Sequence, residues 1–156
     1  MNALSLLKQD HDKAKEVIEQ IESTGEGAVK RRGELFQGLV DDLTVHERIE
    51  EEIFYPALQK HPNAKDLVLE AYVEHGVVDT LLDEISTIDA GDEKWMPTFK
   101  VFKENLEHHI EEEEGELFKK TKSAFSTVQL EDLGAQMAAL KEQAQQELME
   151  EARKES

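Results

Sequence analysis

The sequence predicts an all-α protein, an antiparallel up-and-down four-helix bundle with an additional C-terminal helix. Apolar residues recur every three or four positions along most of the chain, which is the spacing of helices with one buried face. The alternation of β-branched residues that is typical of strands is nearly absent. Turn-forming residues interrupt the periodic segments near Gly25, Pro62 and Gly91, and these breaks separate the first four helices.

The first expected helix covers residues 2–22 and ends at a Ser-Thr-Gly-Glu-Gly turn. The second covers residues 29–59 and ends before the His-Pro pair at 61 and 62. Pro56 has no backbone N–H and clashes with the preceding turn, so we expect it to kink the last turn of this helix.

The third expected helix covers residues 63–88 and ends at an Ile-Asp-Ala-Gly-Asp turn. The fourth covers residues 94–122, with Pro97 in its first turn, where proline is tolerated. Apolar residues on all four helices form narrow inward seams, as in an antiparallel bundle.

Residues 1–125 are expected to form the bundle, and residues 126–156 a C-terminal helical extension. The extension contains a fifth helix over residues 128–153, whose apolar stripe is narrow and which carries no histidine. We expect this helix to pack on the bundle or on a partner chain, for example in a homodimer.

The composition narrows the function. The chain has 156 residues, no cysteine and a formal net charge of −18. The absence of cysteine excludes thiolate metal sites, iron–sulfur clusters and a cysteine nucleophile. The negative field repels nucleic acid and anionic membranes and attracts cations. The N-terminal segment MNALSLLKQDHDKAK has no long apolar run, so we expect neither a signal peptide nor a membrane span, and a cytoplasmic location.

Histidines stand on the apolar seams of four different helices. Residues at matching depths on neighbouring helices of an up-and-down bundle meet in one layer, and we expect this of these four side chains. The four are His11, His46, His75 and His109. The depth on the first helix matches less well, because its histidine is nearer the turn than the histidine of the second helix is. The second helix would therefore have to overhang or start later, near Arg32.

Two glutamates share the seams with these histidines. Glu50 follows His46 by four residues and Glu113 follows His109 by four, so each pair lies on one helix face. A carboxylate cannot stay ionised in an apolar core without a partner, and the seams offer no lysine or arginine. A metal ion is the economical partner. Four imidazoles and two carboxylates suit iron, manganese or zinc, and also suit two metals with bridging oxygens.

These motifs resemble the hemerythrin-like HHE cation-binding domain. The resemblance covers residues 1–122 and rests on LLKQDHDK, HERIEEEIFYP, EHGVVDTLL and HHIEEEEGELF, which occur in that order. It implies a bundle that holds two non-haem iron ions, with an oxo or hydroxo bridge and with zinc or manganese as substitutes. It further implies the ligand set, with His11 and His46 on one iron, His75 and His109 on the other, and Glu50 and Glu113 bridging them.

The chain departs from the pattern of oxygen-carrying hemerythrins in two places. The third helix reads His75-x-x-x-Asp79 where those proteins have a second histidine. The fourth offers Glu113 or Glu114 where they have an aspartate five residues after the histidine. The missing histidine argues against an oxygen carrier of that kind and favours an open coordination position for water, peroxide, dioxygen or nitric oxide.

We therefore expect a di-iron protein that senses or handles dioxygen, peroxide or nitric oxide. The first alternative is a di-iron enzyme with peroxidase-like, catalase-like or ferroxidase activity. The second is a structural metal-binding or interaction module. Within HERIEEEIFYP, Glu50 is expected to face inward, and Glu47, Glu51 and Glu52 are expected to face water. On the fourth helix, His109 with Glu113 fits the seam, and His108 with Glu112 is the other register. Asp79 is an additional candidate ligand or ligand partner.

Overall fold

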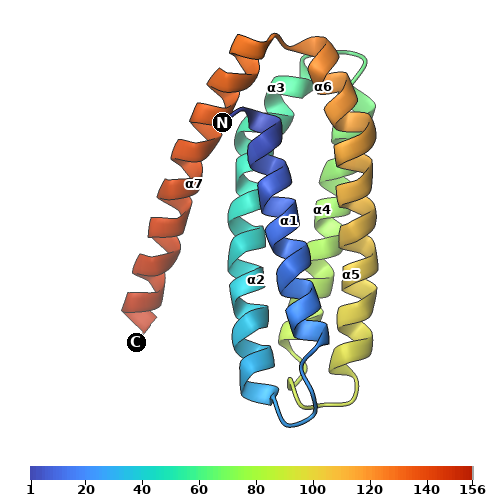
Figure 1. Cartoon of the computed structure of the whole chain (residues 1–156), viewed down its shortest axis with the longest axis vertical. Helices are drawn as coiled ribbons and strands as arrows, with labels where there is room; N and C mark the ends of the chain where they lie inside the picture. Colours follow the sequence, from blue (N-terminus) through green and yellow to red (C-terminus); the bar gives the residue numbers. More distant parts are fainter. Residues whose placement is uncertain (156) are drawn as a thin grey trace.

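The computed structural model describes residues 1–155, and within them it contains helices and no strand. Four long helices form an antiparallel up-and-down bundle (Figure 1). They are α1 (Ala3–Glu22), α2 (Val29–Ile49), α4 (Lys65–Ser86) and α5 (Trp95–Glu112). The predicted fold class is confirmed, and the predicted helices differ from the observed ones by a few residues at their ends.

Two of the long helices pass through a π-helical turn before they end. Helix α2 continues through η1 (Glu50–Phe54) into α3 (Tyr55–Gln59), and α5 continues through η2 (Glu113–Leu117) into α6 (Phe118–Ala124). The N–H of Tyr55 bonds to the carbonyl of Glu50, five residues back, and Phe118 does the same to Glu113. Neither turn was predicted, and π turns of this kind are frequent at functional sites.

The ends of the helices follow from local sequence. The Asn2 side chain caps α1 by accepting a hydrogen bond of 2.9 Å from the N–H of Ser5. At the other end of the bundle, the buried guanidinium of Arg32 donates to Thr24 and to the carbonyl of Ala90. Arg32 thereby joins the turn after α1 to the turn before α5.

Helix α7 (Thr127–Glu155) reverses direction after α6 and packs on α1 and α2. Its C-terminal end diverges from the bundle (Figure 1). Gly134 allows close contact, because a Cβ at this position would overlap the main chain of residues 1–3. The division between a bundle at 1–125 and an extension at 126–156 stays a prediction.

The buried apolar side chains form two clusters. Along α1, the first cluster contributes Leu4 and Leu7, the second contributes Ala14 and Ile18, and His11 lies between them. The same order holds along α4, and on α2 and α5 the histidine lies close to the boundary between the two clusters. The bundle therefore has one buried polar layer between two apolar ones. No helix within residues 1–155 is both long and apolar enough to span a membrane.

Candidate metal centre

Each of the four long helices contributes one buried histidine to the polar layer. The exposed fractions of His11, His46, His75 and His109 are 2%, 6%, 4% and 3%. The rings of His11 and His46 lie 4.9 Å apart, as do those of His75 and His109. The structure thus brings together the four histidines that the seams predicted, as two pairs from neighbouring helices.

Two glutamates complete the layer. Glu50 is fully buried and Glu113 is 2% exposed, and each is the first residue of a π turn. Glu50 therefore faces inward, as the sequence predicted. Burial of two carboxylates is costly unless positive charge compensates them.

The six side chains form two groups that share a carboxylate. In each group, one nitrogen or carboxylate oxygen from every residue lies within 4.8 Å of the others. One group of candidate ligands is His11, His46, Glu50 and Glu113, and the other is Glu50, His75 and His109.

Both glutamates contact one histidine from each group. Oε1 of Glu50 lies 3.1 Å from Nε2 of His46 and 3.1 Å from Nε2 of His75. Oε1 of Glu113 lies 3.2 Å from Nε2 of His11, and its Oε2 lies 3.4 Å from Nε2 of His109. Each carboxylate therefore lies between two candidate metal positions.

Several of the inward atoms have no hydrogen-bond partner. They are Nε2 of His11, Nε2 of His109, Oε1 of Glu113 and both carboxylate oxygens of Glu50. Buried polar atoms in proteins are normally hydrogen-bonded, so a set of orphaned atoms that face one another calls for a ligand. Nitrogen and carboxylate oxygen are donors that suit iron, manganese and zinc. The residues present fit a metal centre.

In each of the four buried histidines, the outer ring nitrogen, Nδ1, contacts a carboxylate from a neighbouring helix. The Nδ1-to-oxygen distances are 2.7 Å for His11–Glu114, 2.9 Å for His46–Asp10, 2.7 Å for His75–Glu51 and 2.8 Å for His109–Glu74. A carboxylate at Nδ1 favours the tautomer in which Nδ1 donates its proton and Nε2 offers its lone pair inward. All four imidazoles are therefore oriented as metal ligands.

The sequence did not predict these four carboxylates as partners of the histidines, and it offered Glu114 only as an alternative to Glu113. The expectation that Glu51 faces water holds in part, because its side chain is 39% exposed but contacts His75. A signal did exist, because each of the four is next to an inward residue in the sequence. The residue next to an inward residue is rotated by about 100° about the helix axis, so its side chain points sideways toward the neighbouring helix. The adjacent pairs are Asp10–His11, Glu50–Glu51, Glu74–His75 and Glu113–Glu114.

Glu47 also differs from the expectation. It is half-buried, and burial together with a hydrogen bond to Asp79 raises its pKa to about 10. Asp79 is therefore a partner of Glu47 and belongs to neither group of candidate ligands. Glu52 is exposed as predicted and pairs with Arg48 at 2.6 Å.

The carboxylates raise the pKa of the His46 and His109 imidazoles. Burial lowers the pKa of His46, but the charge of Glu50 and the hydrogen bond to Asp10 outweigh this and raise the pKa well above its ordinary value. Burial also lowers the pKa of His109, but the nearby carboxylates of Glu113 and Glu74 outweigh this and raise it to about 10. The layer thus favours positive charge beside its carboxylates, which a metal cation also supplies.

Tyr55 is a member of the site that the sequence did not reveal. Its side chain is fully buried, its hydroxyl donates to Oε2 of Glu113 at 2.5 Å, and it lies 3.2 Å from Nε2 of His75. Burial and the charges of Glu113 and Glu50 raise the pKa of this phenol, so it keeps its proton. Tyr55 follows the π turn directly, and its inward position could not be read from a regular seam.

The remaining candidates lie outside the layer. His108 is exposed and contacts Glu112 at the surface, 3.1 Å away. The imidazole of His61 packs edge-on against Phe125, consistent with a structural role. The structure therefore favours the register of His109 and Glu113 over that of His108 and Glu112.

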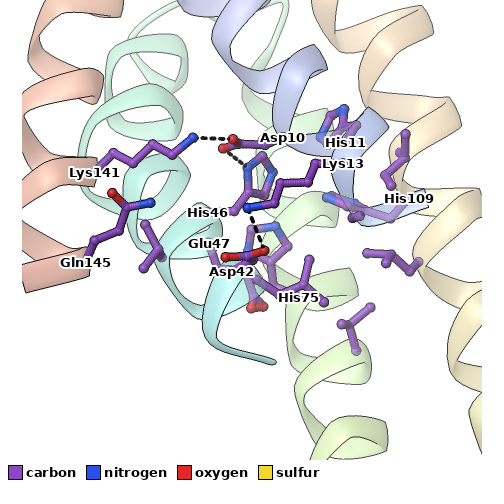
Figure 2. Close-up of a pocket in the computed structure, with 16 residues that line it drawn as sticks. Asp10, His11, Lys13, Asp42, His46, Glu47, His75, His109, Lys141 and Gln145 are labelled. Atoms are coloured by element: carbon purple, nitrogen blue, oxygen red, sulfur yellow. Dashed lines mark hydrogen bonds and ion pairs between the residues drawn. The ribbon is translucent and has the colours of Figure 1, made fainter. Parts of the chain in front are cut away.

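A narrow cavity connects the histidines with the outer side of α1, α2 and α7 (Figure 2). Its inner wall includes all four histidines, and its outer wall includes Lys141 and Gln145 of α7. Lys13 of α1 and Asp42 of α2 form an ion pair of 3.2 Å beside it. A small molecule that enters here would approach the four imidazoles from the side of α7.

Comparison with known proteins agrees with this geometry. Residues 2–121 match the family described as the Hemerythrin HHE cation binding domain. The chain is a hemerythrin HHE cation-binding domain protein. The family assignment covers nearly the whole bundle and confirms the resemblance noted in the sequence.

Relatives and solved structures of this HHE protein extend the comparison. A Mycobacterium tuberculosis protein, Rv2633c, is 33% identical over 150 residues, which are 92% of this chain and 87% of that one. A DNA nickase from Nostoc is 25% identical over 95% of this chain, but the chain spans only 41% of the nickase. A crystal structure of the Rv2633c homologue from Mycobacterium kansasii, an HHE domain-containing protein, matches with a TM-score of 0.88 and 29% identity, covering 98% of this chain and 93% of that one.

Proposed function

We propose that this protein binds two iron ions at the His/Glu layer and senses or handles a small oxidant there, dioxygen, peroxide or nitric oxide. The observation that carries the proposal is the contact pattern of Glu50 and Glu113, each of which touches one histidine from each group. Carboxylates placed in this way suit two metal ions that share bridging ligands.

The proposed ligands are the six inward side chains. His11 and His46 would hold one ion, His75 and His109 the other, with Glu50 and Glu113 between them. Iron bound there would supply redox chemistry toward a small oxidant. Zinc or manganese are the substitutes that the same donor atoms accept.

The other residues serve the ligands. The four outer carboxylates fix the imidazole tautomers, so the Nε2 atoms face the metal positions. The apolar clusters above and below exclude water from the layer. The cavity beside α7 gives a small molecule a path to the imidazoles of the layer. The net charge of −18 disfavours nucleic acid as a partner.

Turnover of peroxide is the second candidate, and Tyr55 favours it. A buried phenol that donates to Glu113 and contacts His75 places a proton beside the metal positions. A sensor needs only reversible binding and makes no use of that proton. The cytoplasmic location and a homodimer through α7 stay predictions.

Elemental analysis of protein expressed with iron and without added zinc tests the proposal. We expect two iron ions per chain and near-ultraviolet absorption from an oxidised, bridged pair. Glu50→Gln should weaken the centre, and Glu52→Gln is the matched control, since Glu52 is exposed and lies two residues away. One ion or fewer per fully loaded chain would contradict the dinuclear centre. Consumption of added peroxide would identify the enzyme, with oxygen release if turnover is catalase-like, and binding without consumption would identify the sensor.

A further inference from the structure

Helix α7 contributes one side chain that reaches toward a candidate ligand. The ammonium of Lys141 donates to Oδ1 of Asp10 at 2.6 Å, and Nδ1 of His46 donates to Oδ2 of the same carboxylate at 2.9 Å. Figure 2 shows the three residues in line from α7 to the inner face of the bundle. Two hydrogen bonds therefore connect the C-terminal helix to His46.

Burial increases along this connection. The side chains of Lys141, Asp10 and His46 are 30%, 13% and 8% exposed. Hydrogen bonds between charged groups are stronger and better defined when water is partly excluded. The bond from Lys141 to Asp10 is thus unlike an ordinary surface ion pair, which contributes little.

The outer carboxylates of the other three histidines lack such support. Glu114 has the nearest equivalent, in Lys8, but at 3.7 Å and with a lysine side chain that is 56% exposed. Within residues 1–155, neither Glu51 nor Glu74 forms an ion pair with a lysine or arginine. In the part of the chain that the structure describes, only Asp10 among the four outer carboxylates forms a short ion pair with a lysine, and this lysine comes from a different helix.

The position of Lys141 is set by the packing of α7. Gly134, Met137 and Ala144 are the buried residues around it, and Gly134 allows close contact with the main chain of residues 1–3. Lys141 follows Gly134 by two helical turns and so lies on the same face. The lysine is therefore presented to Asp10 by the contact that docks α7 on the bundle.

We propose that Lys141 is a positioning residue for the metal ligand His46. It holds the Asp10 carboxylate, and Asp10 in turn fixes the tautomer and ring orientation of His46, so that Nε2 faces the metal position. This inference rests on the proposed function. It assigns to α7 a share in the centre that the sequence did not predict, because the helix carries no ligand of its own.

Three variants of the full chain separate positioning from helix docking. Lys141→Gln removes the charge and the bond to Asp10, and Lys141→Arg retains both. Glu147→Gln is the matched control, because Glu147 joins the same helix to Arg48 of α2 at 2.5 Å without touching Asp10. All three are loaded with zinc, and the release of each ion to an excess of chelator is followed.

We expect one of the two ions to leave Lys141→Gln about 3 to 10 times faster than wild type, somewhat below the effect of deleting a direct ligand partner. Lys141→Arg should restore the wild-type rate, and Glu147→Gln should not change it. Equal acceleration in Lys141→Gln and Glu147→Gln would overturn the inference, because the effect would then come from docking. Unchanged release in Lys141→Gln would overturn it as well.

A second measurement keeps the inference separate from the metal proposal. In metal-free protein, exchange of the His46 Nδ1 proton with water is followed by nuclear magnetic resonance. We expect faster exchange in Lys141→Gln than in Glu147→Gln. If wild type binds no metal, the proposed function fails, and this exchange rate still shows whether Lys141 positions His46. Equal rates in the two variants would refute that role.

Discussion

Replacing Glu51 by glutamine tests how much an outer carboxylate contributes to the centre. Oε2 of Glu51 lies 2.7 Å from Nδ1 of His75, and the glutamate side chain is 39% exposed. Glutamine keeps the size and one accepting oxygen, but it loses the charge that strengthens the bond and favours the donating tautomer of His75. We expect the metal position at His75 to weaken while the fold persists.

The size of the expected loss of stability follows from the loss of metal affinity. Loss of a carboxylate partner of a ligating histidine typically weakens metal binding about 10- to 100-fold. That corresponds to about 1.4 to 2.7 kcal/mol of binding free energy. Binding stabilises the folded state by mass action, so the same amount is lost from the unfolding free energy of the loaded protein. For a chain of this size, the melting temperature should fall by about 3 to 11 °C.

Thermal unfolding of loaded and metal-free protein measures this difference. Glu52→Gln is the control, because Glu52 is the next residue, is 53% exposed and forms only a surface pair with Arg48. The control should change stability by less than about 1 kcal/mol in either state. The reasoning is refuted if Glu51→Gln and Glu52→Gln lower the melting temperature of the loaded protein equally, or if Glu51→Gln acts only on the metal-free protein.

Three further predictions concern other parts of the molecule. His109→Ala should lose one metal ion per chain by elemental analysis, and His108→Ala should keep both; the reverse would move the centre to the surface register. The pKa of His109 is raised to about 10, so its protonated ring stabilises the metal-free fold. This contribution is complete below about pH 6.5 and is lost as the pH rises toward 10. Metal needs the neutral ring, so the gap in melting temperature between loaded and metal-free protein should widen from pH 6.5 to about 9, and a constant gap would contradict this. Gly134→Ala should destabilise by about 1 to 3 kcal/mol in denaturant, because its Cβ overlaps the main chain of residues 1–3. Gly38→Ala, with open space around it, should stabilise by about 0.5 to 1 kcal/mol, and equal effects would refute the clash.

The position of the inward residues was predictable because burial follows local periodicity. His46 and Glu50 are four residues apart on one helix, and the apolar residues before them show which side is buried. The additional rule that successive helices alternate in direction matched the depths of Glu50, His75 and His109, whereas the depth of His11 did not follow from the expected helix lengths.

The outer carboxylates were beyond this reasoning. The bond between His75 and Glu51 crosses between helices and depends on how each helix is rotated about its own axis. A seam gives the inward direction but does not show which neighbouring helix a sideways residue meets. A charged residue beside a ligand thus looked the same as the solvated Glu52.

The π turns were also hidden, and with them the position of Tyr55. A regular helix would continue the seam from Glu50 to Ile53, which is only partly buried, whereas Phe54 and Tyr55 are fully buried. Pro56 follows the first turn, and Gly115 lies within the second, but neither composition is specific to a π turn.

The two π turns absorb a difference in chain length. Each turn accommodates one residue more than the α-helical path would hold, and each begins at an inward glutamate. Deleting one residue between 51 and 54 would therefore restore a regular α-helix and leave the later residues on the same face, with Tyr55 four residues after Glu50. Such a deletion would leave all six inward side chains in the sequence and remove only the extra residue that the turn holds. An alignment that places a one-residue gap within either turn is therefore compatible with the same inward face, whereas a gap in a regular α-helical stretch would rotate the residues beyond it by about 100°.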